Sequence, residues 1–251
     1  WIKLACQVMV PVLFLLGVVL GSQAKELGPV LESFSPLTYA YDYQHAEKFR
    51  TKFIHLYRWH KPKFCHEYKC PEYEVLDEHE GYELRRYQPS VWVSISRLYD
   101  GWLNEDERRL QFMALFRYIS GNNNQHARIP MTLPVLTRME HKPVFGKSCQ
   151  CNWTMFFMLP NEYQLNQPKP RDPDVRVSTL PAINVYVRSF SGLATSKDYK
   201  KQLGELSHAI GNYRKYSQKE YFTAEYDAPF VRHNRHNEVW FLASEQSYPE
   251  L

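Results

Sequence analysis

The stretch that decides the fold is Tyr82-Glu83-Leu84-Arg85-Arg86-Tyr87, which alternates apolar and polar side chains directly after a turn at Glu80-Gly81. Successive side chains of a strand point to opposite faces of a sheet, so this alternation predicts a strand with one buried face. Pro89 interrupts the pattern. Val91-Trp92-Val93-Ser94-Ile95 then resumes it with the β-branched and aromatic residues that strands favour. Upstream, Tyr73-Glu74-Val75-Leu76-Asp77 predicts the partner strand of a hairpin.

A helix is expected from Leu103 to Ile119. Its first turn holds three acidic residues at 105–107, which stabilise the positive end of a helix dipole, and Gly121 follows in the C-cap position. A polar loop over 122–128 then leads into a strand that ends near Pro134-Val135.

The same order of elements returns in the second half of the chain. A strand, a helix and a strand are predicted at 184–190, 196–213 and 220–226. Tyr186 follows Trp92 by 94 residues, and Pro229 follows Pro134 by 95. Two units with one spacing predict a duplicated α+β fold. We expect a distorted antiparallel β-barrel, with two helices outside it and a pseudo-twofold repeat.

Between the two units, Trp153 to Leu159 predicts a further strand and 160–173 a proline-rich connection. The second helix carries a narrow apolar stripe, which we expect to pack on the sheet. Its members are Tyr199, Leu203, Leu206, Ile210 and Tyr213.

The N-terminus indicates export. Lys3 precedes an apolar run from Leu4 to Leu20, and Ser22 and Ala24 supply the small residues of a signal-peptidase site. We expect a signal peptide at 1–24 and a secreted, extracellular protein with no membrane segment after cleavage. A retained membrane anchor is the alternative, because the run is close to the shortest that spans a bilayer. An N-terminal extension at 25–69, a domain at 70–246 and a tail at 247–251 would follow.

The cysteines that follow the signal number four, which suits disulfides in an exported protein. They are Cys65, Cys70, Cys149 and Cys151. Cys149 and Cys151 are too close in an extended chain to bond each other, so we expect Cys65 and Cys70 each to pair with one of them, in an order that stays open. A four-thiolate zinc site is the alternative. Asn152-Trp153-Thr154 is an N-glycosylation sequon and makes Asn152 a candidate acceptor.

Charge and motifs exclude several classes of function. The 31 basic and 27 acidic residues leave a net charge of +4, and the basic residues are scattered, so the sequence offers no phosphate-binding stripe for nucleic acid. The sequence contains no nucleophile elbow, zincin helix or phosphate-binding glycine loop, so we do not expect an enzyme. A hydrolase would need a cleft carboxylate such as Glu83 or Glu225, and each is expected to be solvated or salt-bridged.

Several motifs, in a fixed order, carry a family resemblance. They are Gly81 to Tyr87 with Val91 to Ser94, Tyr118 to Asn123, Ile129 to Val135, Val185 to Phe190, Tyr221 to Tyr226, and Asn237 to Phe241. Together they resemble the SOUL heme-binding proteins from about Cys70 to Leu242. The resemblance implies a distorted β-barrel with two helices and a pseudo-twofold repeat, and a non-covalently bound heme or other tetrapyrrole in a hydrophobic cleft along the first helix.

Residue by residue, the resemblance places this cleft at Arg109, Phe112, Phe116 and Arg117, with Met131 and Leu133 on the facing strand. Phe112 and Phe116 would flank a flat macrocycle, an arginine would pair with its propionates, and Met113 would fill space beside them. The alternative is structural: a helix needs an apolar face to cover a sheet, and its arginines are solvated.

One position departs from the family pattern. Where some members are proposed to carry an axial histidine, before the tyrosine that ends the first hairpin, this chain has Arg86, which cannot ligate iron. Other candidate ligands are His55, His60, His66, His79 and His126. A secreted protein-interaction or structural module that no longer binds heme, with an extracellular protein partner, is therefore the second hypothesis.

Overall fold

The computed structural model describes residues 59–142 and 150–244. The predicted signal peptide, most of the N-terminal extension, the C-terminal tail and Cys149 lie outside the described residues. Within those residues, the structure contains no helix that is both long and apolar enough to cross a membrane.

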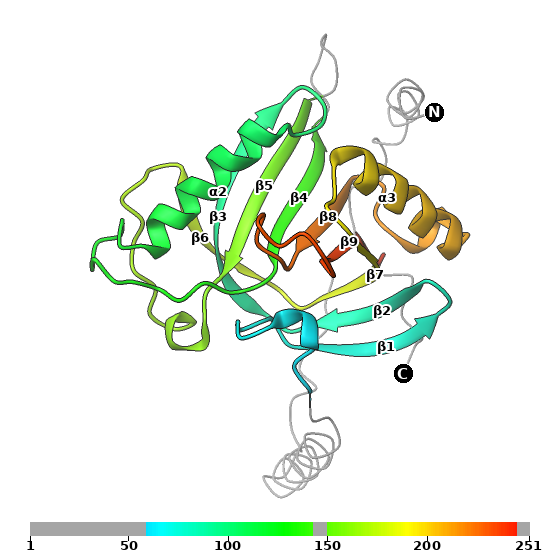
Figure 1. Ribbon diagram of the computed structural model, residues 1–251, viewed down its shortest axis with the longest axis horizontal. Coiled ribbons are helices and arrows are strands. Elements are labelled where there is room, and N and C mark those ends of the chain that lie inside the picture. Colours follow the sequence, from blue (N-terminus) through cyan, green and yellow to red (C-terminus); the bar gives the residue numbers. More distant parts are fainter. Residues whose placement is uncertain (1–58, 143–149, 245–251) are drawn as a thin grey trace, which may run out of the picture. The chain divides into compact units, whose positions relative to one another are not determined.

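A single curved antiparallel sheet forms the half-barrel in Figure 1. Its strands are β1 (Tyr73–His79), β2 (Tyr82–Tyr87), β3 (Ser90–Tyr99), β4 (Val135–Lys142), β5 (Gln150–Met158), β6 (Val175–Leu180), β7 (Ile183–Ser191), β8 (Glu220–Glu225) and β9 (His236–Leu242). They lie in the order β1-β2-β7-β9-β8-β4-β5-β3-β6. The α+β class and the distorted barrel are thus confirmed.

The strand order contains the predicted pseudo-twofold repeat. β4 and β8 pair at the centre, and moving outward β5 corresponds to β9, β3 to β7 and β6 to β2. The first strand of each repeat unit pairs with a strand of the other unit. β2 of the first unit pairs with β7 of the second, and β6 of the second unit pairs with β3 of the first. This exchange ties the two halves into one sheet.

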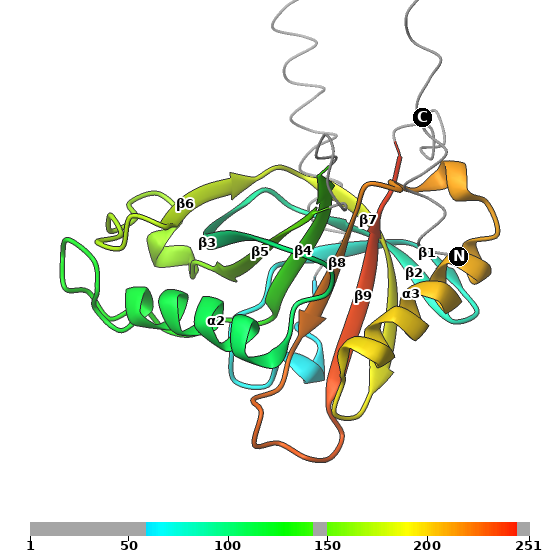
Figure 2. The same cartoon turned by 90° about the horizontal axis from the view of Figure 1, so that it is seen from above.

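Two helices occupy equivalent places in the repeat. α2 (Glu105–Ile119) packs on β3, β5 and β6, and α3 (Ser196–Ile210) packs on β7 and β9 (Figure 2). Both begin with a capping box: Asn104 with Glu107 in α2, and Thr195 with Asp198 in α3. Each box satisfies backbone N–H groups that the first turn leaves without partners.

The inner face of the half-barrel has its own core, which includes Tyr87, Leu136 and Trp240. A segment that we call the strap, residues 59–72, lies against this core and contains the short helix η1 (Lys63–Cys65). Phe64 of the strap stacks on His236 with ring centroids 3.9 Å apart. Lys69 accepts a backbone hydrogen bond from Leu133 and forms an ion pair with Glu162.

Three boundaries and one whole strand differ from the sequence-based expectations. The strand expected to end near Pro134-Val135 instead begins there, as β4. β6 was not predicted at all. α2 ends with Ser120 rather than Gly121 as its C-cap. α3 ends at Ile210 because Gly211 adopts a left-handed conformation (φ 68°), so Tyr213 leaves the apolar stripe and is exposed.

The expected disulfide pairing is wrong. Cys65 and Cys70 bond each other, with Cα atoms 6.1 Å apart, because the turn after η1 brings them together. Cys151 is a buried free thiol on β5, and its Sγ lies 3.8 Å from His141 Nδ1. Burial raises the pKa of this thiol.

Candidate functional site: the outer face of α2

Helix α2 carries apolar side chains on both of its faces. The inner face, with Leu115, Tyr118 and Ile119, is buried against the sheet. The outer face exposes Leu110 (69%), Phe116 (41%) and Met113 (38%). A globular helix that only covers a sheet has one apolar face, so the outer residues need another explanation.

The second helix provides the comparison within the same chain. Both helices have 15 residues and matching capping boxes, so the repeat aligns Leu110, Met113 and Phe116 with Lys201, Gly204 and Ser207. The outer face of α3 is therefore polar or small where that of α2 is apolar. The fold does not require the apolar outer face of α2.

We call Leu110, Phe112, Met113 and Phe116 the α2 stripe. The rings of Phe112 and Phe116 stack on each other, with centroids 5.9 Å apart and 14° between their planes. Phe112 also meets Phe157 of β5 edge-on at 5.2 Å, which anchors the pair to the core. Rings in mutual contact leave no room for a third plane between them. A macrocycle would therefore lie across this pair, and not between the two rings as the sequence suggests.

The facing-strand residues divide between two cores. Met131 is half-buried and packs in the same cluster as Phe112. Leu133 is buried in the inner core instead, with Leu136 and Trp240. The structure thus brings Met131 to the α2 stripe and leaves Leu133 on the other side of the sheet.

Two arginines flank the stripe. Arg109 is exposed, and Arg117 is half-exposed with its Nη2 3.7 Å from Asp172 Oδ2. Arg108 turns inward instead, where it donates a hydrogen bond to Glu225 of β8. Arg109 and Arg117 are thus the guanidinium groups beside the stripe that an anionic ligand can reach.

Arg86, which stands where some family members are proposed to carry an axial histidine, does not lie on the outer face of α2. Arg86 lies on β2, where its Nε donates to Asn184 Oδ1 at 3.2 Å, and α2 packs on β3, β5 and β6. Three candidate histidines have other partners: His66 with Asp227, His79 with Asp77, and His126 with Arg171. His60 is exposed, and His55 lies outside the described residues. In the part of the chain that the structure describes, His, Cys, Asp and Glu form no group of three that could hold a metal ion.

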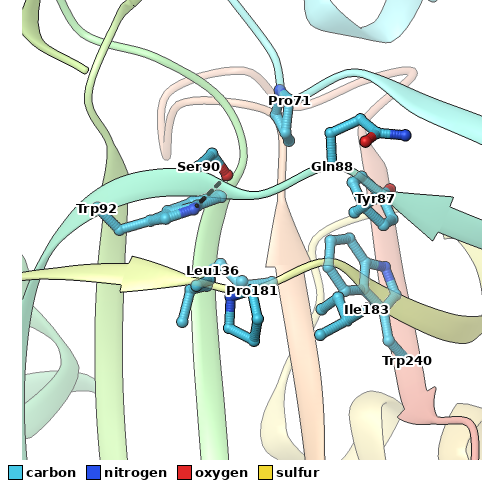
Figure 3. Close-up of a pocket in the computed structure, with 10 residues that line it drawn as sticks. Pro71, Tyr87, Gln88, Ser90, Trp92, Leu136, Pro181, Ile183 and Trp240 are labelled. Atoms are coloured by element: carbon cyan, nitrogen blue, oxygen red, sulfur yellow. Dashed lines mark hydrogen bonds between the residues drawn. The ribbon is translucent and has the colours of Figure 1, made fainter. Parts of the chain in front are cut away.

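A small cavity lies on the inner face of the sheet, away from α2 (Figure 3). Aromatic side chains form much of its wall, with Tyr87, Trp92 and Trp240 among them. About 10 Å³ of it admits the centre of a water molecule, which is room for about one water. It cannot hold a tetrapyrrole in this conformation.

A buried ionic cluster beside this cavity had no sequence signal. Arg85 Nη1 donates to Glu238 Oε1 at 3.0 Å, and Tyr226 and Trp240 donate to the other oxygen of Glu238 at 3.0 and 2.8 Å. Burial alone raises the pKa of Glu238, but Arg85 and then His236 oppose it, and the net effect lowers this pKa to about 2. Because the donors around Glu238 are side chains of the core itself, we assign the cluster to the stability of the fold.

The two carboxylates that a hydrolase would use are also paired. Glu225 accepts from Arg108, and Glu83 accepts from Arg85 Nε at 2.6 Å. Each was expected to be solvated or salt-bridged, and the structure shows both in ion pairs. The sequon residue Asn152 lies half-buried within β5, and Thr154 is buried with its hydroxyl 2.8 Å from that of Ser96. Glycosylation at Asn152 stays a prediction.

Sequence comparison identifies the family. The family model described as SOUL heme-binding protein matches residues 68–242. The chain belongs to the SOUL family. Among SOUL relatives, human heme-binding protein 2 is 32% identical over 184 residues, covering 73% of this chain and 87% of the relative. Mouse heme-binding protein 2 is 30% identical, with 70% and 83% covered, and Xenopus tropicalis heme-binding protein 1 is 27% identical, with 64% and 83% covered.

Solved structures also match part of this chain at low similarity. The EcmrR C-terminal domain has a TM-score of 0.47 and 11% identity, covering 68% of this chain and 98% of that domain. At this level the likeness carries no argument about function.

Proposed function

We propose that this chain is a non-catalytic, secreted tetrapyrrole-binding protein, and that the ligand lies flat on the α2 stripe. The observation that carries the proposal is the exposed apolar face of α2, which α3 lacks at the equivalent positions of the repeat. Membership of the SOUL family supports heme as the ligand, and the names of the relatives agree.

The residues of the stripe fit such a group. Leu110, Met113 and Phe116 offer an apolar platform to the macrocycle. Each Å² of apolar surface that the contact removes from water is favourable by about 25 cal/mol. Arg109 and Arg117 lie beside the platform and can pair with propionates. Heme would supply a redox-active iron, and the chain would supply the binding surface and its charge.

Hemin titration tests this proposal. We expect a saturable Soret change with the wild-type protein and weaker binding after Phe116→Ala or Leu110→Ala. Leu165→Ala is the matched control, because Leu165 is 90% exposed in the connection after η2 (Asn161–Tyr163) and does not belong to the stripe. Absence of a saturable change at micromolar protein, or equal loss in all three variants, contradicts the proposal.

Secretion rests on the signal-like segment at 1–24 and on the Cys65–Cys70 disulfide, which suits an oxidising compartment. Expression of the whole chain in a secretory cell should release a protein whose N-terminus is Lys25. Retention in the membrane fraction with residues 1–24 attached would instead support an anchor.

The second candidate function is a secreted protein-interaction module that has lost its heme. The presence of Arg86 in place of a histidine favours it, as does an exposed apolar stripe that a protein partner could also cover. Under this alternative, a partner captured by the whole secreted chain would be lost after Phe116→Ala while hemin produced no Soret change.

A further inference from the structure

We infer that the loop between β8 and β9 docks the protein onto an anionic lipid bilayer, with the ring of Phe230 inserted at the headgroup boundary. Three features of the molecule support this role: the exposure of Phe230, the hydrogen bonds that shape the loop, and the charges beside it. The loop contains no residue of the α2 stripe, so membrane docking and heme binding can be tested separately.

Phe230 is the most exposed aromatic residue in the part of the chain that the structure describes. Its exposed fraction is 83%, and Pro229 before it is exposed as well. The loop that carries them projects past the ends of the neighbouring strands (Figure 2). A single exposed ring needs no explanation by itself, so the build of the loop and its surroundings decide the matter.

Arg235 holds the loop in a fixed shape. Its side chain is buried, and its Nη1 donates to the carbonyl oxygens of Ala228 and Val231 at 2.6 and 3.0 Å. Nη2 donates to the carbonyl oxygen of Asp227 at 3.0 Å, and the N–H of Val231 donates to the carbonyl of Ala228, which closes the turn around Phe230. The ring is thus presented by an ordered turn, and little conformational entropy is lost when it binds.

The turn after β7 brings a second apolar side chain to the same end of the sheet. Ser191 is the register partner of His236, and Asn237 Nδ2 donates to the carbonyl oxygen of Gly192 at 2.9 Å. The turn therefore lies beside the start of β9, where the Phe230 loop ends. It carries Leu193, which is 68% exposed. Two neighbouring loops thus offer apolar side chains at one end of the molecule.

The exposed charge of the Phe230 loop is positive. Within residues 227–235, Arg232 and His233 are exposed, and the acidic residue is Asp227, whose side chain is only 3% exposed. Its carboxylate is engaged, because Oδ1 lies 3.0 Å from Nε2 of His66 and Oδ2 accepts from the backbone N–H of His236 at 2.7 Å. Exposed cations beside an aromatic side chain suit a surface of anionic lipid headgroups.

The strap adds further cations at the base of the loop. Phe64 stacks on His236 at the start of β9, which places the strap next to the loop. Lys61 and Lys63 are exposed, and Glu67 is the acidic residue of the strap between 61 and 70. The positive charge of this end therefore extends beyond the loop itself.

The shape of this end favours a bilayer over a protein partner. A stable protein interface buries about 800 Å² on each partner and places its aromatic anchors in pockets. Phe230 instead stands on a projecting turn (Figure 2). A bilayer needs no matching pocket, because the ring enters the boundary between headgroups and acyl chains.

Vesicle flotation tests the inference. The vesicles contain phosphatidylcholine alone or phosphatidylcholine with phosphatidylserine. The protein is the form released by a secretory cell, because the apolar run at 4–20 would itself bind a bilayer. Phe230→Ser is compared with Leu165→Ser, the matched control, because Leu165 is 90% exposed in the connection between β5 and β6 and has uncharged neighbours.

We expect the wild type to prefer the anionic vesicles and to bind them more weakly as the salt concentration rises. Phe230→Ser should weaken binding by about tenfold or more, and Arg232→Ser by about fivefold, whereas Leu165→Ser should bind as the wild type does. Phe230→Trp should keep the binding and should lose more tryptophan emission to brominated lipid than the wild type loses.

Other results would overturn the inference. These are failure of the wild type to bind anionic vesicles, or equal binding by Phe230→Ser and Leu165→Ser. If Phe230→Ser loses a captured protein while the wild type binds no vesicles, the loop docks a protein and the assignment to a bilayer is wrong. Both serine variants should keep the free energy of unfolding within about 0.5 kcal/mol of the wild type, which excludes unfolding as the cause of lost binding. Phe230→Ser should also leave the hemin titration unchanged, so either proposal can fail without the other.

Discussion

Arg85 and Glu238 form an ion pair inside the half-barrel, although 153 residues separate them in the chain. Arg85 is 2% exposed and Glu238 is fully buried. The pair spans from β2 to β9 across β7, and Phe64 of the strap stacks on His236, whose Nε2 is 2.8 Å from Glu238 Oε1. One carboxylate thus connects a strand from each of the two repeat units with the strap.

Replacing Arg85 tests this arrangement. Arg85→Met removes the cation and leaves the carboxylate of Glu238 buried without its ionic partner. The expected loss in the free energy of unfolding is about 3–5 kcal/mol, measured by urea denaturation. Arg97→Met is the control, because Arg97 and Asp174 form an ion pair in which both side chains are almost half-exposed, and we expect a change of about 0–1 kcal/mol. Equal effects in the two variants would argue against a special role for the buried pair.

Acid should weaken the fold through the same carboxylate. The folded-state pKa of Glu238 is lowered from the ordinary value of 4.5 to about 2. A lowered pKa contributes stability above the ordinary value, and this contribution is lost as the pH falls from 4.5 through 2. The shift corresponds to about 3 kcal/mol. The free energy of unfolding, measured between pH 6 and pH 2, should fall less steeply in Glu238→Gln than in the wild type. Parallel slopes would contradict the assignment.

The strap disulfide should contribute less than the long-range bridges that the sequence suggests. Cross-linking a loop of six residues stabilises a fold by about 2 kcal/mol in the chain-entropy description. Cys65→Ser with Cys70→Ser should lower the free energy of unfolding by about that amount, and the control Cys151→Ser shows the cost of changing a buried thiol. The pairing itself can be checked by digestion with trypsin, which cuts after Lys63 and Lys69 and so leaves the two cysteines in separate peptides. Without reductant these peptides should migrate as one mass, and a peptide joined to Cys149 or Cys151 would contradict the structure.

The repeat is predictable because its signals are local. Apolar and polar residues alternate at 82–87 and 91–95, and this pattern depends only on neighbouring residues. The same holds for the acidic residues that precede the regularly spaced apolar residues of a helix. The strand at Val175–Leu180 escapes prediction because it follows a proline-rich connection and pairs with β3, 80 to 90 residues earlier in the chain. Which strands cross between the halves is likewise a property of the whole sheet.

The candidate site is predictable in part for the same reason. The spacing of Phe112 and Phe116 places them on one face of a helix, but the contact of Phe112 with Phe157 of β5 joins residues that are distant in the chain. Leu133 and Met131 are two residues apart and still enter different cores, because the chain passes from one side of the sheet to the other between them. Arg85 and Glu238 each resemble an ordinary strand charge until the sheet brings them together.

The α2 stripe should be dispensable for folding. Phe116→Ser and Leu110→Lys install the residues that α3 carries at the equivalent positions, Ser207 and Lys201. Leu110 is 69% exposed, so Leu110→Lys should alter the free energy of unfolding by no more than about 0.5 kcal/mol. Phe116→Ser also removes the stacked ring contact with Phe112 and should cost about 1–2 kcal/mol.

The matched variant for this comparison is Leu206→Ala on the buried face of α3, where the loss of a fully buried side chain should cost about 2–5 kcal/mol. The effects on hemin affinity should be ranked the other way round. The two stripe variants should lose much of their affinity, and the Leu206→Ala protein that remains folded should bind hemin almost as the wild type does. Should Phe116→Ser unfold the protein as readily as Leu206→Ala, the apolar outer face of α2 would belong to the core, and its exposure would no longer point to a ligand.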